Sequence, residues 1–235
     1  MSTHPFSPEM VPLIPAEPCV DCGGSGYIVK EQASICHCRQ GFRVEVSKAL
    51  PKRWHDKHLW DLSTDGMKGQ SADLFKKFLG IARRYASEFS STTKRGLKIE
   101  GPVGVGKSHI AAGILKEVIL RGFRGTYWNF AALSLEARSG EYGMGEHAIL
   151  QKCRESHLVV LDDVGVEKAS EFSARLAYEI IETRMDISRP TIVTTNCDDL
   201  ELKARYGEMG ERLSSRFAEH MVPIVLGNFP DYRRK

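Results

Sequence analysis

Apolar residues recur along most of the chain with two different spacings, which predict alternating helices and strands. Helical spacing marks the segments 71–89, 109–120 and 170–187. Short apolar and β-branched runs predict strands near residues 97–101, 126–130, 157–163, 190–196 and 221–226. Pro223 places the last strand at an edge, because proline cannot donate a ladder hydrogen bond. The alternation predicts an α/β fold, with a mostly parallel sheet covered by helices on both faces.

The first sixty residues lack this alternation. Five of the ten prolines fall within residues 1–18, a spacing that is incompatible with a helix or a central strand. We expect residues 1–18 to form a flexible or extended tail, which serves as a linker or binds a partner. A cysteine-containing module and a basic linker follow over residues 19–60, and the α/β domain spans residues 61–235.

Composition and charge narrow the class of protein. The 235 residues suffice for one full domain and a small accessory one. With 33 basic and 30 acidic residues, the net charge of +3 creates no strong global field, so any DNA contact must come from local patches. No apolar run is long enough to span a bilayer, and no secretion signal opens the chain. We therefore expect a cytoplasmic protein without a membrane partner.

Four of the six cysteines are clustered in two pairs that predict a structural Zn²⁺ site. A hairpin strand beginning at Tyr27 would return the chain to the second pair, and a segment this short and polar needs a metal to fold. His37 is an alternative to one of the cysteines. A redox pair or free thiols are alternatives to zinc, although a redox pair expects a βαβ unit that is absent here. Cys153 and Cys197 are expected to be buried free thiols. The expected zinc ligands are Cys19, Cys22, Cys36 and Cys38.

The linker that follows is rich in basic residues. Residues 39–58 carry six lysines and arginines against two acidic residues, with Trp54 and Trp60 among or beside them. Aromatic residues interleaved with cations suit single-stranded nucleic acid. The alternative is a solvated helix face on which tryptophan anchors the linker to the main domain.

The stretch 97–108 contains the most specific chemical motif, G-x-x-x-x-G-K-S. Glycines allow backbone N–H groups to face phosphate oxygens, the lysine reaches the terminal phosphates, and the serine hydroxyl is a ligand for Mg²⁺. A buried strand before the loop and an apolar helix after it complete the context. The sequence therefore predicts a nucleoside triphosphate site. Its expected residues are Gly101, Pro102, Val103, Gly104, Val105, Gly106, Lys107, Ser108 and His109.

Polar residues also end two later strands. The strand at 157–163 delivers Asp162 and Asp163 to its carboxyl end, about 55 residues beyond the phosphate loop. At such a position the first acid holds Mg²⁺ and the second polarises the attacking water. Asn196 ends the next strand and is expected to orient water, although a helix cap or turn is the usual role of asparagine there.

These features resemble the AAA+ ATPases. Two arginine segments extend the resemblance: it places Arg216 as an arginine finger that acts on a neighbouring subunit, and Arg233 as a sensor-two arginine. For an isolated arginine, a surface ion pair is the alternative. Asp163 departs from the wider pattern, in which glutamate is usual, so its shorter side chain is expected to hold the water less closely. A guanine-reading Asn-Lys-x-Asp motif is absent, which argues against a GTPase, and no acceptor site or arginine-bearing lid of a small-molecule kinase is visible.

Within the AAA+ class, the chain resembles the DnaC/DnaI family of replicative helicase loaders from the cysteine cluster to its last residues. The Leu50-Pro-Lys-Arg-Trp linker belongs to this resemblance, as does an end at Lys235 that leaves no residues for a C-terminal helical lid. The resemblance implies an ATPase that loads a hexameric replicative helicase onto single-stranded DNA. It also implies self-association in an ATP-dependent spiral. IstB transposition ATPases share the ATPase core but commonly lack the zinc module, and they are the second interpretation.

The loop after the acid pair, residues 165–172, has two interpretations. The resemblance implies that it faces DNA, with Lys168 and Ser170 contacting phosphate and Phe172 stacking on a base. Alternatively, Ser170 caps the following helix and Phe172 packs in the core.

Overall fold

A computed structural model describes residue 20 and residues 27–29, 33–35, 42–57, 59, 62, 69–139, 145–227 and 229. The four expected zinc ligands, the tail at 1–18, Trp60 and Arg233 lie outside these residues. Within the described part of the chain, no helix has both the length and the apolar character that a membrane crossing requires.

The centre of the fold is a five-stranded parallel sheet in the order β4-β5-β6-β3-β7. Each strand lies within one residue or so of a predicted strand, which confirms the sheet prediction. The strand β7 lies at an edge, as Pro223 indicates. The strands are β3 (Gly96–Glu100), β4 (Gly125–Asn129), β5 (Leu158–Val164), β6 (Thr191–Thr195) and β7 (Met221–Val225).

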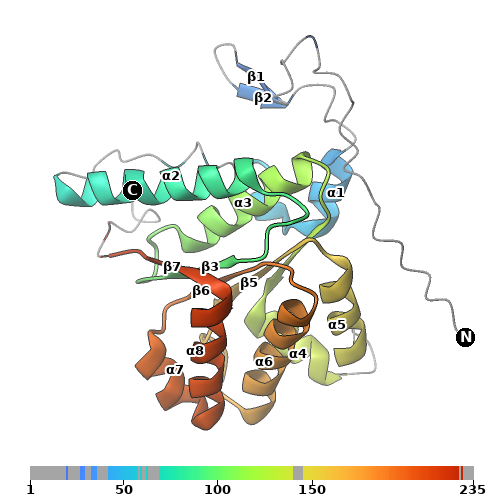
Figure 1. Cartoon of the computed structure of the whole chain (residues 1–235), viewed down its shortest axis with the longest axis vertical. Coiled ribbons are helices and arrows are strands. Elements are labelled where there is room, and N and C mark those ends of the chain that lie inside the picture. Colours follow the sequence, from blue (N-terminus) through green and yellow to red (C-terminus); the bar gives the residue numbers. More distant parts are fainter. Residues whose placement is uncertain are drawn as a thin grey trace, which may run out of the picture.

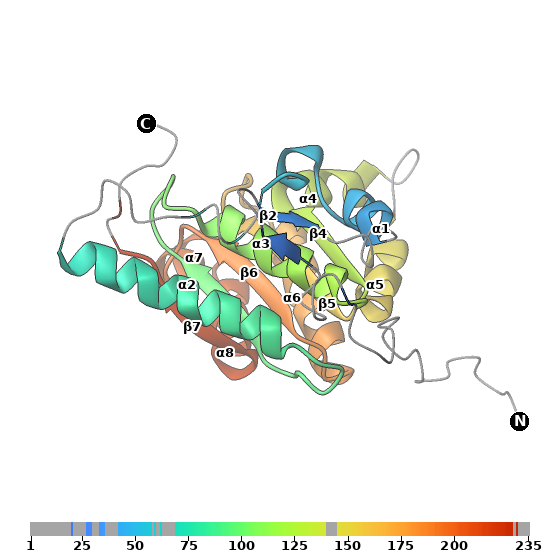
Figure 2. The same ribbon diagram turned by 90° about the horizontal axis from the view of Figure 1, so that it is seen from above.

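Helices cover both faces of this sheet (Figure 1). One face carries α1 (Phe42–Ala49), α2 (Gln70–Glu88) and α3 (Lys107–Leu120). In Figure 2, α2 lies toward β7 and α1 toward β4, with α3 between them. The other face carries α4 (Phe130–Ser139), α5 (Glu146–Glu155), α6 (Glu171–Asp186), α7 (Asp199–Tyr206) and α8 (Glu208–His220).

The three helices predicted from apolar spacing are α2, α3 and α6, and all three are confirmed. The helices α4, α5, α7 and α8 were not predicted. For α5 and α7 the reason is that each buries very little: Ile149 and Cys153 in α5, and Leu202 in α7. The helix α6 begins where Ser170 caps it, with the Ser170 side chain accepting a hydrogen bond from the Ser173 N–H.

The strand β5 shows how the sheet divides the core. Leu158 and Val160 face the cluster beneath α2 and α3, whereas Val159 and Leu161 face the cluster beneath α4, α6 and α8. All four side chains are fully buried. Because side chains alternate along a strand, a continuous apolar run is what a strand covered on both faces requires. This rigid strand carries the acid pair at its carboxyl end.

Two segments before the main domain are also ordered in the structure. The hairpin of β1 (Tyr27–Val29) and β2 (Ala33–Ile35) is antiparallel, which confirms the strand predicted between the cysteine pairs. The linker forms a short 3₁₀ helix, η2 (Lys52–Trp54), and Leu50 before it is buried against the core. Trp54 packs against the same core and donates from Nε1 to the Tyr127 hydroxyl over 3.3 Å. Trp54 therefore anchors the linker to the main domain.

Candidate ATP-binding and hydrolysis site

The phosphate loop connects β3 to α3, so the backbone N–H groups of the first turn of α3 point into it. Gly101, Gly104 and Gly106 all have positive φ values, of 152°, 84° and 95°. A Cβ atom at Gly101 would lie 2.4 Å from the carbonyl oxygen of Leu226, so the position accepts only glycine. The loop thus has the backbone geometry of an anion cradle.

Lys107 lies at the base of this cradle and is 5% exposed. Its ammonium donates to the carbonyl oxygens of Gly101, over 2.7 Å, and Pro102, over 2.8 Å. It also donates to Oδ1 of Asn196, which follows the adjacent strand β6. Oxygen acceptors therefore surround the ammonium, and phosphate oxygens are acceptors of the same kind. The structure brings the predicted Lys107 and Asn196 into direct contact.

Asp162 is fully buried, and hydroxyl groups on the two neighbouring strands hold its carboxylate. The Tyr127 hydroxyl on β4 donates to Oδ2 over 2.5 Å, and the Thr194 hydroxyl on β6 donates to Oδ1 over 2.7 Å. Burial and the adjacent Asp162 carboxylate raise the pKa of Tyr127, so the phenol stays protonated and can donate. The Arg53 guanidinium lies 3.8 Å from Oδ2. Tyr127 and Thr194 were not among the predicted site residues. Thr194 is a polar residue near the end of its strand, which was an available signal, whereas Tyr127 lies in the middle of β4 and the sequence carried no signal for it.

Asp163 turns away from its neighbour because the chain changes conformation at this point. The pairing of β5 with β6 shifts register between Leu161 and Val164, and Asp163 adopts a left-handed φ of 61°. Its N–H donates to the Thr194 hydroxyl over 2.9 Å. One threonine therefore holds both members of the acid pair, with Asp162 inside the sheet and Asp163 half-buried at its end. Residues in such sparsely populated conformations concentrate at functional sites.

The loop after the acid pair is tied to the other helical layer. The Gly165 N–H donates to the Glu167 carboxylate over 3.0 Å, and the Tyr206 hydroxyl of α7 donates to the same carboxylate. The Phe172 ring is partly buried, and the guanidinium carbons of Arg138 and Arg175 lie 4.9 Å and 5.4 Å from its centroid. Phe172 is therefore packed among neighbouring side chains.

Arg216 lies on α8, whereas the oxygen atoms that accept hydrogen bonds from Lys107 lie in the phosphate loop and directly after β6. Its guanidinium makes ion pairs with Glu219, over 2.8 Å, and with Glu182. Neither carboxylate belongs to the ATP site of the same chain. Arg233 and the four clustered cysteines lie outside the described residues, and no group of three or more potential metal-binding side chains occurs among the residues that are described. Cys153 and Cys197 are buried free thiols, as predicted.

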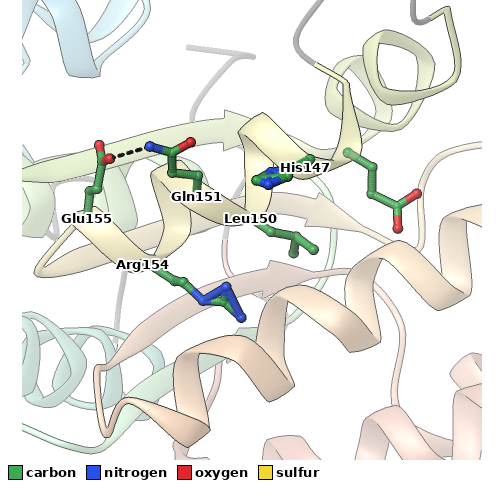
Figure 3. A pocket seen from close by; sticks show the side chains of 6 residues that line it. His147, Leu150, Gln151, Arg154 and Glu155 are labelled. Carbon is green, nitrogen blue, oxygen red and sulfur yellow. Dashed lines mark hydrogen bonds between the residues drawn. The ribbon is translucent and has the colours of Figure 1, made fainter. Parts of the chain in front are cut away.

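A surface hollow of about 580 Å³ lies on α5, lined by Glu146, His147, Leu150, Gln151, Arg154 and Glu155. Figure 3 shows its labelled side chains along that one helix, with the 3.0 Å hydrogen bond from Gln151 to Glu155. None of the predicted site residues lines this hollow.

The parallel sheet, the phosphate loop and the buried acid define the AAA+ P-loop fold, and comparisons with known proteins agree. Residues 82–217, more than half of the chain, match the family described as IstB-like ATP binding protein. The chain belongs to this family of ATP-binding proteins.

Individual relatives make the comparison more specific. The replicative helicase loader DnaC of Escherichia coli K12 is 28% identical over 159 residues, which cover 67% of this chain and 63% of that protein. A Mycobacterium tuberculosis protein named for ATP binding in an insertion sequence is 26% identical over 98 residues, covering 42% of this chain and 39% of its own length. A crystal structure of the DnaC helicase loader superposes with a TM-score of 0.63 at 26% identity, covering 74% of this chain and 99% of that one.

Proposed function

We propose that this chain is a Mg·ATP-dependent ATPase that loads a hexameric replicative helicase onto single-stranded DNA, with ATP acting as an assembly switch. The observation that carries the proposal is an ATP site with its polar groups in place, in a chain similar to proteins named DnaC helicase loaders. The E. coli relative extends beyond the matched region, so helicase loading is inferred from part of its length.

The residues at the phosphate loop fit Mg·ATP. Lys107 is already ringed by oxygen atoms, and the positive-φ glycines open the backbone toward an anion. The Ser108 hydroxyl and the Asp162 carboxylate are hard oxygen ligands of the type that Mg²⁺ prefers. The metal, when bound, neutralises charge on the phosphate oxygens during phosphoryl transfer.

Asp163 and Asn196 complete the assignment of roles. Asp163 is half-buried and follows Asp162 directly, and we assign it to polarise the attacking water. Its side chain is one carbon shorter than the usual glutamate, so the water is held less closely and turnover is slow. Asn196 hydrogen-bonds the Lys107 ammonium and orients that group or the water. Slow hydrolysis gives the ATP-bound assembly time to act before it releases the helicase.

Two subunits are needed for hydrolysis in this proposal. The ion pairs of Arg216 link α8 to Glu182 of α6 and to Glu219, and its side chain is still 35% exposed, so a neighbouring subunit can reach it. Arg216 therefore serves the ATP of the neighbour, and repetition of this contact builds the spiral. Arg233 is assigned as the sensor-two arginine on resemblance alone.

For single-stranded DNA, we assign the phosphate contacts to the loop at 165–172. Lys168 is exposed, and Arg138 lies against the capping residue Ser170 and the Phe172 ring. Cations near a phosphate supply affinity that weakens with salt. Because two guanidiniums already lie over Phe172, we assign that ring to packing. We assign Lys168 and Arg138 to contacts with DNA phosphates.

Cys19, Cys22, Cys36 and Cys38 are proposed to bind one Zn²⁺ within the module at 19–60, ahead of an ATPase domain at 61–235. Elemental analysis of the purified protein should give one zinc per chain, and replacing Cys19 and Cys38 by serine should remove it. Sub-stoichiometric metal that is unchanged by these substitutions would contradict the assignment.

Co-purification with candidate hexameric helicases, with and without ATP, tests the main proposal. We expect an ATP-dependent complex that is lost in Lys107→Ala, while the Lys203→Ala variant serves as a surface control. The second candidate function is a transposition helper, which the family and the M. tuberculosis relative favour. ATP-dependent capture of a transposase, with no helicase retained under any condition, would replace the first proposal by the second.

A further inference from the structure

The linker residue Arg53 lies over the acid that is expected to hold Mg²⁺. Nη2 of Arg53 is 3.8 Å from Oδ2 of the fully buried Asp162. The other two polar groups on this carboxylate are the neutral hydroxyls of Tyr127 and Thr194. Arg53 is therefore a cation that the structure places within ion-pair distance of Asp162.

The main chain around Arg53 is firmly placed. The buried Lys116 of α3 donates from Nζ to the carbonyl oxygens of His55 and, over 3.1 Å, Lys57. Trp54 donates a hydrogen bond to the Tyr127 hydroxyl. The centroid of the Trp54 ring lies 5.7 Å from that of His109, in the helix that follows the phosphate loop. The position of Arg53 near Asp162 is therefore a property of the packed linker.

The Arg53 side chain lies at the protein surface, where it also contacts the Tyr127 hydroxyl. It is 59% exposed, and 3.8 Å is too long for a direct hydrogen bond to the carboxylate. Its guanidinium also lies 5.1 Å from the centroid of the Trp54 ring. A flexible cation on a fixed backbone can leave the carboxylate for solvent without disturbing the fold, and a divalent ion arriving at Asp162 would repel it.

We propose that Arg53 is a placeholder for the metal: it neutralises Asp162 while the site is empty and gives way when Mg·ATP binds. Arg53 thereby discourages Asp162 from taking up a divalent cation before the nucleotide arrives, and it makes metal binding conditional on ATP. This role rests on the proposed Mg·ATP site. It assigns Arg53 as a positioning residue that acts through Asp162.

The test uses Mn²⁺, a spectroscopically visible substitute for Mg²⁺, with the nucleotide-free full-length protein. We expect Arg53→Gln to bind Mn²⁺ roughly three- to tenfold more tightly than the wild type, because a nearby positive charge is removed. Lys52→Gln removes an equal charge from the neighbouring exposed position and should leave the affinity unchanged. The gain should disappear in the double variant Arg53→Gln with Asp162→Asn. Equal Mn²⁺ affinity in Arg53→Gln and the wild type would overturn the proposal.

A second measurement follows the Arg53 side chain through Trp54. When Mg·ATP is added, the emission of Trp54, taken as the difference between wild type and Trp54→Phe, should change as the guanidinium leaves the ring. In Arg53→Gln this change should be smaller, because only the effect of nucleotide near His109 remains, and a change of equal size there would contradict the exchange. Binding of a fluorescent ATP analogue separates the two proposals. If the analogue does not bind, the ATP site is wrong; normal binding with unchanged Mn²⁺ affinity removes only the role of Arg53.

Discussion

The ATP site and the arginine-bearing surface of α8 hold their functional groups in opposite ways. Lys107 and Asp162 are buried, and each is fixed by hydrogen bonds from or to neighbouring strands. Arg216 is 35% exposed and is held by carboxylates that are themselves partly exposed. Exposed ion pairs contribute little free energy, so the guanidinium can exchange one partner for another. One region is organised within the chain, and the other, in the proposed function, completes the site of a neighbouring subunit.

The largest effect is expected when Arg216 is removed. We expect Arg216→Ala to lower ATP turnover on the order of a thousandfold, because an arginine finger stabilises charge in the transition state. ATP affinity, measured with a fluorescent analogue, should stay unchanged, and Arg212→Ala on the same helix is the control. Mixing Arg216→Ala with Asp163→Asn should restore some phosphate release through mixed interfaces. Failure to rescue at every mixing ratio would argue against a shared site.

The substitution Lys107→Ala tests the buried ATP site. Loss of several charge-assisted hydrogen bonds to phosphate should weaken ATP affinity by roughly a hundredfold. Titration with the same fluorescent analogue measures it, with circular dichroism to confirm the fold and Lys168→Ala as the exposed control. A variant that binds ATP like the wild type would remove the phosphate loop from nucleotide binding.

The substitution Thr194→Val tests how much the shared hydroxyl stabilises Asp162 and Asp163. The substitution preserves shape but leaves the buried Asp162 oxygen and the Asp163 N–H without their shared hydroxyl. The free energy of unfolding in urea should fall by about 1–3 kcal/mol. Thr92→Val, at an exposed position, should change it by less than about 0.5 kcal/mol. Equal effects would mean that the threonine is not a significant support.

Two variants test the loop at 165–172, which follows the acid pair. Phe172→Ala should lower the melting temperature by a few degrees, because a partly buried ring is lost, and leave DNA affinity nearly unchanged. Arg138→Gln should weaken ATP-dependent binding of single-stranded DNA severalfold and reduce the salt dependence by about one phosphate contact. The reverse pattern, with DNA affinity lost only in Phe172→Ala, would restore base stacking as the role of the ring.

The smallest effect is expected at Glu219, one of the carboxylates that hold Arg216. Because the pair is exposed, Glu219→Gln should change the free energy of unfolding by less than about 1 kcal/mol. Turnover should be equal to or slightly above that of the wild type, since the arginine is held less tightly. A large drop in stability or turnover would show that Arg216 belongs to its own chain's structure.

Local pattern was sufficient to predict the elements that form the ATP site. A strand, a glycine-rich turn, Lys107, Ser108 and an apolar helix follow one another directly, so short-range geometry determines them. The run before Asp162 identified a strand buried on both faces. The helices α5 and α7 escaped prediction because few of their residues are buried.

The partners of these residues depended on which strands become neighbours. Tyr127, Thr194 and Arg53 are distant from Asp162 in the sequence, and only the order β4-β5-β6 and the packed linker bring them to it. Arg184 is a similar case: in sequence it resembles a solvated residue near a helix end. In the structure its buried guanidinium donates to the carbonyl oxygens of Ser156 and Pro190, at the starts of β5 and β6.

The sequence by itself therefore determined the chemistry of the ATP site, because its motifs are contiguous and each residue type has a narrow range of roles. Tertiary structure alone decided what surrounds those motifs: a threonine shared by two acids, a linker arginine beside the buried Asp162, and an aromatic ring beneath two guanidiniums. Such contacts form between strands and helices that are far apart in the chain, and hydrophobic spacing carries no information about which of them will meet.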